Sequence, residues 1–577
     1  MSSTLVILPI HLFDIDIILN TLESIHTLDT QTNITDIYII EEPIYFGDRD
    51  IKLNFNKLKL IYHRASMKYY HDYLENNMSK KNSKTKINTK ITITYLDYND
   101  LKSKTSSGYK TIKGYSKIHM FDPVDTLLES KYAKLFGKKL NYLESPLFLC
   151  SNKNLDDYHK YKPNKDSYTH VSFYKWQRTR LHILENDKTY DTENRNQMPL
   201  DTKIPPLPKN DAKSHHHYLV EAIEYINKSP TFNKNLEPIY VSGVSGVSGV
   251  SGVSGVSGVS GVSGVSGVSG VSSVEDKQHI TPDSIHFPIT HKSSIAWLEH
   301  FCKNRLDNFG KYEDSIDSVP RNFLFHSTIS PMLNIGLITP EQVVTIVSNY
   351  YNKHKGSGGS GGSIDIATYE GFMRQVMGWR EYQRYIYKYI GDKMRNSNYF
   401  NNDRKLKDNW YKATTGIKPV DDAIMLAMND GYIHHILRLM VVGNFMNLVG
   451  IHPDEVYKWF MEFSMDSYDW VMIGNVYSMT LWADGGLTMR KPYISGDGYI
   501  MKMGNYKDKG KGKGKGKGKG DWNTIWNNVF HHFIDRNQVP LSKTYYNGIV
   551  KAWIRKTEKD KKEEITKAKE FIDSISV

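Results

Sequence analysis

Short apolar runs alternate with longer polar stretches over roughly the first 135 residues. The runs TLVILPI, DIYIIEE and ITITYL have the length and β-branched content of strands, and the stretch MKYYHDYLENN has helical character. Strands that alternate with helices are typical of an α/β domain with a mainly parallel sheet. We therefore predict such a domain over residues 1–135.

The pattern changes beyond residue 275, where apolar residues recur at helical spacing and strand-like alternation ends. The clearest such segments are 294–308, 340–351, 369–394, 419–449 and 454–463. Pro340 and Pro453 stand where two of them begin, a position that proline favours. We predict an all-helical domain over 275–577, which makes the chain an α+β multidomain protein.

Residues 136–274 form a predicted connector between these domains. It is irregular to about residue 230, and ten VSG triplets occupy 241–270. Glycine at every third position removes the strand pattern and adds an entropic cost, so we expect disorder there. Two further low-complexity loops, 356–363 and 507–520, interrupt the helical domain.

Composition and charge narrow the class of protein. The 577 residues are 39% hydrophobic and 24% charged, as in folded globular proteins. The net charge is +12, but the Lys-Gly loop at 507–520 supplies half of it, so the remaining bias permits nucleic-acid binding without establishing it. Two cysteines exclude a disulfide framework and a four-thiolate cluster. The amino-terminal apolar run lacks the basic flank of a signal peptide, and no apolar run reaches 18 residues, so we expect a soluble, intracellular protein.

Two adjacent histidines, His434 and His435, stand in an apolar segment that we predict to be helical. Neighbouring positions on a helix point about 100° apart, which suits one shared metal ion poorly, so no metal site is predicted. The pair either consists of hydrogen-bonded core residues or includes a proton donor or acceptor that faces a cleft.

Three other segments carry polar groups that suit a ligand. Residues 371–382 bring Arg374, Trp379 and Arg380 onto a helix, where Gly378 leaves room for a close neighbour or a ligand; an ordinary amphipathic helix is the alternative. The hydroxyl groups of Ser327, Thr328 and Ser330 precede a helix, where they suit a phosphate or simple capping. Residues 475–486 are predicted to form a polar loop that lines a ligand site.

The ordered set of these segments resembles the cryptochrome/photolyase superfamily, specifically its prokaryotic (6-4) photolyase branch with iron-sulfur clusters. The matching motifs are FHSTISPMLNIGLITP, EGFMRQVMGWREY, GYIHHILRLMVVGNF, NVYSMTLWADGG and KPYISGDGYI, with weaker support from FDPVDTLLE, ESPLFLCSN and TYDTENRN. The resemblance implies a Rossmann-like antenna domain, a helical domain that binds FAD, and ultraviolet-damaged DNA as the partner of a monomeric protein.

By the same resemblance, each predicted site residue receives a role. Residues that bind or brace FAD would be Tyr312, Ser327, Thr328, Ser330, Arg374, Trp379, Arg380, Arg438, Asn444, Asp466, Tyr468, Asn475 and Asp484. Catalytic residues would be His434 and His435 beside the lesion, Trp459 as an electron relay, and Tyr493. Plausible contacts to DNA phosphates are Lys388, Lys393, Arg490, Lys491 and Lys502, with a solvated charged face as the alternative.

The sequence also departs from that family. The four cluster cysteines would fall near Pro419, Lys507, Gly510 and residues 520–524, and none is present, so no iron-sulfur cluster is expected. Met472 replaces an acid near the flavin, and Phe460 replaces a relay tyrosine. Residues 9–12 replace the Gly-Asp-Gln-Leu turn of the family's antenna site. The binding of an antenna chromophore is therefore an open question, with Glu41 or Glu42 as its remaining candidate contacts.

Three functions follow as hypotheses. The first is a light-driven lyase that repairs (6-4) pyrimidine photoproducts by electron transfer from reduced FAD. The second is a cryptochrome-like FAD photoreceptor without repair activity, and the third is a structural relic of the fold that no longer binds flavin.

Overall fold

The structure, a computed structural model, describes most of the chain outside its low-complexity segments. The described residues are 2–29, 32–81, 91–162, 168–186, 188–191, 195–208, 212–239, 280–318, 321–356, 364–506 and 522–577. The VSG repeat at 241–270, residues 357–363 and the Lys-Gly loop at 507–520 lie outside these ranges, so the expectations for them stay predictions.

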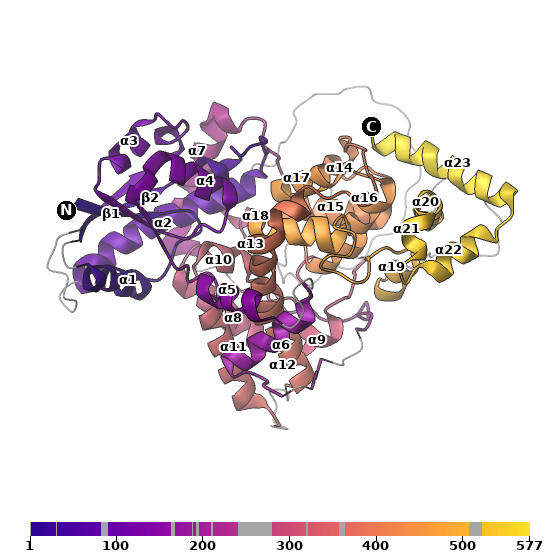
Figure 1. Cartoon of the computed structure of the whole chain (residues 1–577), viewed down its shortest axis with the longest axis horizontal. Coiled ribbons are helices and arrows are strands. Elements are labelled where there is room, and N and C mark those ends of the chain that lie inside the picture. The colour runs from indigo at the N-terminus through magenta and orange to yellow at the C-terminus, as the bar shows by residue number, and fades with distance from the viewer. Residues whose placement is uncertain are drawn as a thin grey trace, which may run out of the picture.

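A parallel five-stranded sheet forms the core of the amino-terminal domain, in the order β3-β2-β1-β4-β5 (Figure 1). Its strands are β1 (Ser2–Ile7), β2 (Asn33–Ile40), β3 (Thr92–Leu96), β4 (Lys117–Phe121) and β5 (Leu140–Leu143). In the central strand β1, Leu5 aligns with Ile37 on one side and His119 on the other. Every residue of β1 after the first is buried, as expected for a parallel strand covered on both faces.

The helices around this sheet confirm the predicted α/β domain. They are α1 (Ile15–Leu28), α2 (Lys57–Lys81), α3 (Ser107–Lys113) and α4 (Thr126–Phe136). The three predicted strands are β1, β2 and β3. However, β5 lies beyond residue 135, and helices occupy much of the region expected to be irregular: α5 (Asn152–Tyr161), α6 (His170–Leu181) and α7 (Ala212–Lys228). Their polar composition masked these helices in the sequence. Contacts such as that of Arg64 with Glu221 (2.6 Å) hold α7 on α2.

The second half of the described chain is helical, as predicted. Its main helices are α8 (His291–Asn304), α9 (Leu306–Tyr312), α10 (Ser330–Ile335), α11 (Pro340–His354), α12 (Ile366–Met373), α13 (Glu381–Arg395), α15 (Lys418–Asp430), α16 (Asn444–Val449), α17 (Pro453–Phe463), α18 (Asp469–Met472), α20 (Trp522–Arg536), α22 (Asn547–Ile554) and α23 (Glu558–Ile575). Three π-helical segments lie among them, η7 (Arg374–Arg380), η8 (Leu437–Gly443) and η9 (Ile473–Thr480). Residues 475–480 therefore belong to a helix, where a polar loop was predicted.

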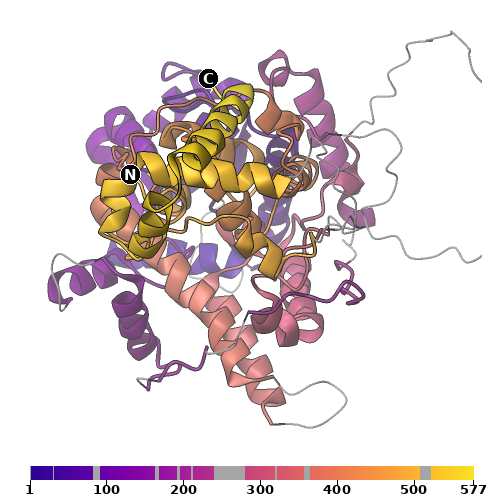
Figure 2. The same ribbon diagram turned by 90° about the vertical axis from the view of Figure 1, so that its right-hand side faces the viewer.

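The carboxyl-terminal helices α20, α22 and α23 lie at the end of the molecule far from the sheet (Figures 1 and 2). The last residues return to the helical core, where the indole Nε1 of the buried Trp410 donates to the carbonyl of Ile575 at 3.0 Å. In the described part of the chain, no helix combines the length and apolarity that a bilayer span requires.

A buried ionic cluster joins the two domains. The Arg49 guanidinium, from the α/β domain, binds Asp125 at 2.7 Å and lies 3.4 Å from Asp469 at the start of α18. Arg395 binds the same carboxylate of Asp469 at 2.6 and 2.7 Å. Since α18 leads directly into η9, this cluster ties a π-helical segment to the sheet domain.

Candidate functional site

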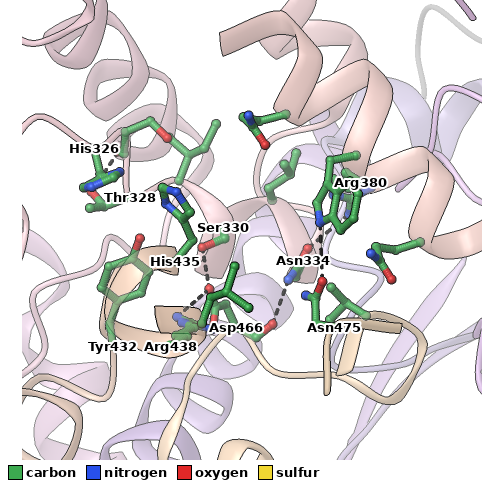
Figure 3. A pocket seen from close by; sticks show the side chains of 18 of the residues that line it. His326, Thr328, Ser330, Asn334, Arg380, Tyr432, His435, Arg438, Asp466 and Asn475 are labelled. Atoms are coloured by element: carbon green, nitrogen blue, oxygen red, sulfur yellow. Dashed lines mark hydrogen bonds and ion pairs between the residues drawn. The ribbon is translucent and has the colours of Figure 1, made fainter. Parts of the chain in front are cut away.

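A large cavity lies in the helical domain and is bordered by η7, η8 and η9 (Figure 3). It holds about 1320 Å³ of unoccupied space, counting its open mouth. π-Helical segments distort regular helices and often occur at functional sites. The predicted site residues that line the cavity are Ser327, Thr328, Ser330, Trp379, Arg380, His435, Arg438, Asp466 and Asn475.

An ion pair between Arg438 and Asp466 forms part of the cavity wall. The guanidinium binds both carboxylate oxygens, at 2.9 and 3.2 Å, and the Ser330 hydroxyl donates to the same carboxylate at 2.6 Å. Burial by itself would raise the pKa of Asp466, but the charge of Arg438 and the hydrogen bonds from Ser330 and Ser464 lower it below its ordinary value. The carboxylate is therefore charged at neutral pH.

Arg380, at the end of η7, supplies a second buried cation. Its guanidinium donates to the carbonyl of Leu147 at 2.5 Å and to the side chain of Asn334 at 3.1 Å, and lies over the rings of Phe148 and Trp470. Burial lowers its pKa to about 10, so it still carries its charge at neutral pH. Its Nε has no hydrogen-bond partner among the described residues.

The loop that carries the three predicted hydroxyl groups has a strained backbone at Thr328. This residue has a φ of 52°, in the left-handed region that β-branched residues rarely adopt. The indole Nε1 of Trp297 donates to the Thr328 hydroxyl at 3.0 Å and to the carbonyl of Ser327 at 3.1 Å. Such strain persists when the surroundings hold it, and it is common at ligand sites.

Gln383 lines the cavity with an amide group that lacks partners. Neither its Oε1 nor its Nε2 finds a hydrogen bond within the described residues, although the residue is buried. The lack of a side chain at Gly474 leaves room for Gln383, because a Cβ on Gly474 would stand 1.9 Å from Gln383 Oε1. A buried polar group without a partner is costly, so this amide suits a polar ligand in the cavity.

Three histidines meet at one side of the cavity. The rings of His326 and His434 stack with centroids 4.6 Å apart, and the ring of His435 meets His326 edge-on at 5.4 Å. The prediction placed both neighbouring histidines on a helix, but α15 ends at Asp430 and the chain is not helical from Tyr432 to His434. His434 therefore points into the core, while His435 lines the cavity and is 44% exposed.

The other predicted residues lie outside the cavity lining. Arg374 is paired with Asp191, Asn444 with Ser495, and Asp484 with Thr488. The Tyr468 hydroxyl meets His63 of α2 at 2.9 Å, so this tyrosine faces the α/β domain. The remaining ones are Tyr312, which stacks on Phe325, Trp459, which donates to the carbonyl of Trp410, the exposed Tyr493, and His434.

The space beside Gly378 belongs to the protein's own side chains. A Cβ at this position would stand 2.7 Å from the ring of Tyr174 and 3.1 Å from His170. Of the two explanations offered for this glycine, close packing of a neighbour is the one that the structure shows.

The proposed antenna and DNA contacts have other partners or lie at the surface. Glu41 accepts from Arg64 at 2.7 Å and from Tyr95 at 2.5 Å, and Glu42 from Lys131 at 2.6 Å. Pro419 stands near the start of α15, and Met472 and Phe460 line the cavity. All five predicted phosphate contacts, Lys388, Lys393, Arg490, Lys491 and Lys502, are exposed, and Lys388 is paired with Asp156 at 2.8 Å.

Several cavity residues were missed by the sequence analysis. His326 and Asn334 stand inside the motif at 325–340, His326 before α10 and Asn334 within it, but only the hydroxyl groups of this motif were predicted to meet a ligand. Gln383 follows the matched motif of η7 by one residue. Glu313 reaches the cavity from α9, and no pattern in its neighbourhood signals it.

Taken together, the parallel α/β domain, the helical domain and its cavity lined by two arginines define a two-domain protein with a large ligand-sized cavity in its helical part. Residues 17–232 match the family described as deoxyribodipyrimidine photo-lyase-related protein, and residues 369–493 match the FAD binding domain of DNA photolyase. The chain belongs to the cryptochrome/photolyase superfamily, in its photolyase-related branch.

Individual relatives cover parts of the chain. A (6-4) photolyase from Agrobacterium fabrum is 36% identical over 222 residues, which are 38% of this chain and 42% of that protein. The chain thus matches less than half the length of this relative. Two uncharacterised proteins of Acanthamoeba polyphaga mimivirus are also similar, one 53% identical over 17% of this chain and 72% of its own length, the other 34% identical over 34% and 96%.

Solved structures of the superfamily are similar over most of the chain. A cryptochrome from Synechocystis sp. PCC6803 has a TM-score of 0.49 at 13% identity and covers 83% of both chains. A bacterial class III photolyase from Agrobacterium tumefaciens has a TM-score of 0.46 at 13% identity and covers 87% of this chain and 86% of its own.

The cavity residues fit FAD. The unpaired amide of Gln383 and the Nε of Arg380 offer polar partners to a ligand. Further polar side chains stand among aromatic and aliphatic ones in the rest of the wall. Sites for cofactors of this size are mostly apolar with a few placed polar groups, as this one is.

Proposed function

We propose that the chain binds FAD in this cavity and uses it for the light-driven repair of (6-4) pyrimidine photoproducts in DNA. One observation carries the proposal: side chains from four separate segments of the sequence, each expected to hold FAD or to meet the lesion, line the same cavity. The lining residues are Ser327, Thr328 and Ser330 from the first segment, Trp379 and Arg380 from the second, His435 and Arg438 from the third, and Asp466 and Asn475 from the fourth. Family membership and the similarity to a (6-4) photolyase support it.

Within this proposal, the chain's own groups bind and orient the cofactor. Arg380 supplies buried and Arg438 partly buried positive charge, and Gln383 and Asn475 supply amide groups at the cavity wall. Asp466 holds Arg438 in place through its two contacts. Reduced FAD, when bound and excited by blue light, would supply an electron to the lesion.

His435 is the proposed proton donor to the lesion. It reaches the cavity and is partly exposed, as a group must be to meet a nucleotide that has left the base stack. Its Nε2 lies 3.6 Å from Asp314, whose carboxylate also accepts from the Tyr499 hydroxyl at 3.3 Å. Asp314 would orient the imidazole and stabilise its protonated form.

The exposed cations Lys393, Arg490, Lys491 and Lys502 are proposed contacts to the DNA backbone. Lesion binding by such groups is expected to weaken with salt, since neutralised phosphates release counterions. Lys388 is a weaker candidate because Asp156 already engages it.

The test begins with protein purified in dim light. A flavin spectrum, followed by light-dependent loss of (6-4) photoproducts from ultraviolet-damaged DNA, would support the proposal. His435→Ala should keep the flavin and lose repair, and His452→Ala, at a partly exposed position in front of α17, is the matched control. Flavin that is photoreduced without lesion loss would favour a photoreceptor, and a folded protein without flavin would contradict both functions.

A further inference from the structure

The cluster of His326, His434 and His435 has the composition of a metal site. One ring nitrogen of each histidine lies within 4.8 Å of one ring nitrogen of both others. Imidazole is the commonest protein ligand for transition metals, and three imidazoles with one open position form a familiar zinc site.

Two buried nitrogens in this cluster lack partners. His326 Nε2 and His434 Nδ1 make no hydrogen bond within the described chain, and the two residues are only 6% and 1% exposed. A buried imidazole nitrogen without a partner carries a desolvation cost. Two such atoms in one cluster indicate a ligand that supplies the missing interactions.

The surroundings of His435 complete the arrangement. Asp314 Oδ1 lies 3.6 Å from its Nε2, which leaves Nδ1 as the other ring nitrogen available to an ion. A carboxylate behind a metal-binding histidine fixes the ring and increases its basicity. The nearby Glu313 adds a second acid at the cavity wall, while the charge of Arg438 is balanced by Asp466.

We propose that His326, His434 and His435 bind a divalent transition cation of the Zn²⁺ class, with the fourth coordination position open to the cavity. Nitrogens that share a tetrahedral zinc ion lie about 3.3 Å apart, given Zn–N bonds of about 2.0–2.1 Å. The rings would therefore have to move together by roughly 1.5 Å at most relative to the present 4.8 Å limit. Binding of the metal ion requires neither FAD nor DNA. An ion bound to His435 would, however, block the side of the cavity where this histidine is proposed to meet a lesion.

Equilibrium dialysis of the full chain, as purified with its flavin, against Zn²⁺ alone tests this site. The wild type should hold one tightly bound ion more than His434→Gln or His435→Gln, whose affinity at the site should fall by about 100-fold or more. Asp314→Asn should weaken binding by about 10–100-fold. His71→Gln is the control, because His71, Asp72 and Glu75 are another group with metal-ligand spacing, and it should leave the histidine site unchanged.

Co²⁺ in place of Zn²⁺ provides a second readout, since tetrahedral nitrogen ligation gives strong visible bands. These bands should appear in the wild type and disappear in His435→Gln. Because His435 is partly exposed, this substitution should leave the fold intact, so unfolding would not explain the loss of the bands. Equal zinc stoichiometry in the wild type and both histidine variants would overturn the proposal, and so would absence of tight binding in the wild type. Failure of the zinc-free wild type to repair lesions, although added zinc still binds at the site, would count against the proposed function alone.

Discussion

Arg438 and Asp466 are joined by two parallel contacts, at 2.9 and 3.2 Å, although 28 positions separate them in the sequence. Arg438 also donates to the carbonyl of Ile433 at 2.6 Å, and Asp466 accepts from Ser330 at 2.6 Å. Paired contacts of this kind fix orientation as well as distance. The pair thereby holds η8, α10 and the segment before α18 around one cavity.

Arg438→Leu should abolish flavin retention and destabilise the fold. It removes a partly buried cation from the cavity and leaves the buried Asp466 carboxylate without its charged partner, which costs about 3–5 kcal/mol in unfolding free energy. The double variant Arg438→Leu/Asp466→Leu should recover most of that stability, because no charge is left unpaired, while the flavin-to-protein ratio stays low. A double variant that regains flavin would show that the pair supports only the fold.

The same carboxylate predicts an acid dependence of stability. Because the folded pKa of Asp466 is lowered, its contribution is present above the unfolded pKa of about 3.9 and is lost as the pH falls through the folded value. The difference in unfolding free energy between wild type and Asp466→Asn should therefore be constant at pH 5–6 and shrink toward pH 3. Urea titrations across this range measure it, and an unchanged difference at pH 3 would contradict the assignment.

The fold was largely predictable from the sequence, because the spacing of apolar residues distinguishes the strands of the first domain from the helices of the second. Strands β4 and β5 were not among the three predicted strands. Strand β5 lies at the edge of the sheet, where two of its four residues are exposed and the other two only partly buried. The π-helical segments were not predicted, because a wider turn over a few residues leaves the spacing of apolar residues along the helix almost unchanged. Their consequence is large, since they aim Trp379, Arg438 and Asn475 into one cavity.

Only the site residues that lie within the matched family motifs could be predicted from the sequence. Ser330 and Asp466 are 136 positions apart, and only the resemblance to a family placed them together. The inward turn of His434 depends on the helix ending at Asp430, with Gly431 at a φ of 60°. Glycine at this position is a helix-stop signal, which the prediction of one helical segment over 419–449 did not use. Glu313 reaches the cavity through tertiary packing alone.

Gly443→Ala should destabilise the protein at the contact between η8 and η9. A Cβ there would stand 2.2 Å from Thr480 Cγ2 and 2.7 Å from the carbonyl oxygen of Arg438. Overpacking of this kind costs about 1–3 kcal/mol, measured as a shift of the urea midpoint. Gly548→Ala in α22 is the control: nothing lies within 4 Å of its Cβ position, so it should be neutral or stabilising by up to about 1 kcal/mol.

Phe460→Tyr should accelerate photoreduction of the flavin, if FAD occupies the cavity as proposed. Phe460 lines the cavity, and the centroid of its ring lies 5.1 Å from that of Trp459. A tyrosine at this position would therefore place a more readily oxidised ring between Trp459 and the flavin. The rate of flavin bleaching under blue light with an external reductant measures the effect. Phe463→Tyr is the matched control, because Phe463 also touches Trp459, at 4.6 Å, without lining the cavity. Equal acceleration by both variants would argue against a relay through position 460.

Asp469→Asn should be the most destabilising single change at the junction of the two domains. The carboxylate is fully buried and accepts from Arg395 at 2.6 and 2.7 Å and from the Tyr387 hydroxyl at 2.6 Å, with Arg49 at 3.4 Å. Neutralising it leaves the buried Arg49 with Asp125 alone and removes the carboxylate partner of the partly buried Arg395, at a cost of about 3–5 kcal/mol. Thermal unfolding of the variant should begin at a markedly lower temperature. Asp156→Asn removes the partner of Lys388 in a surface pair and should cost less than about 1 kcal/mol. If the two variants melted alike, the domains would be held together by apolar packing and the ionic cluster would contribute little.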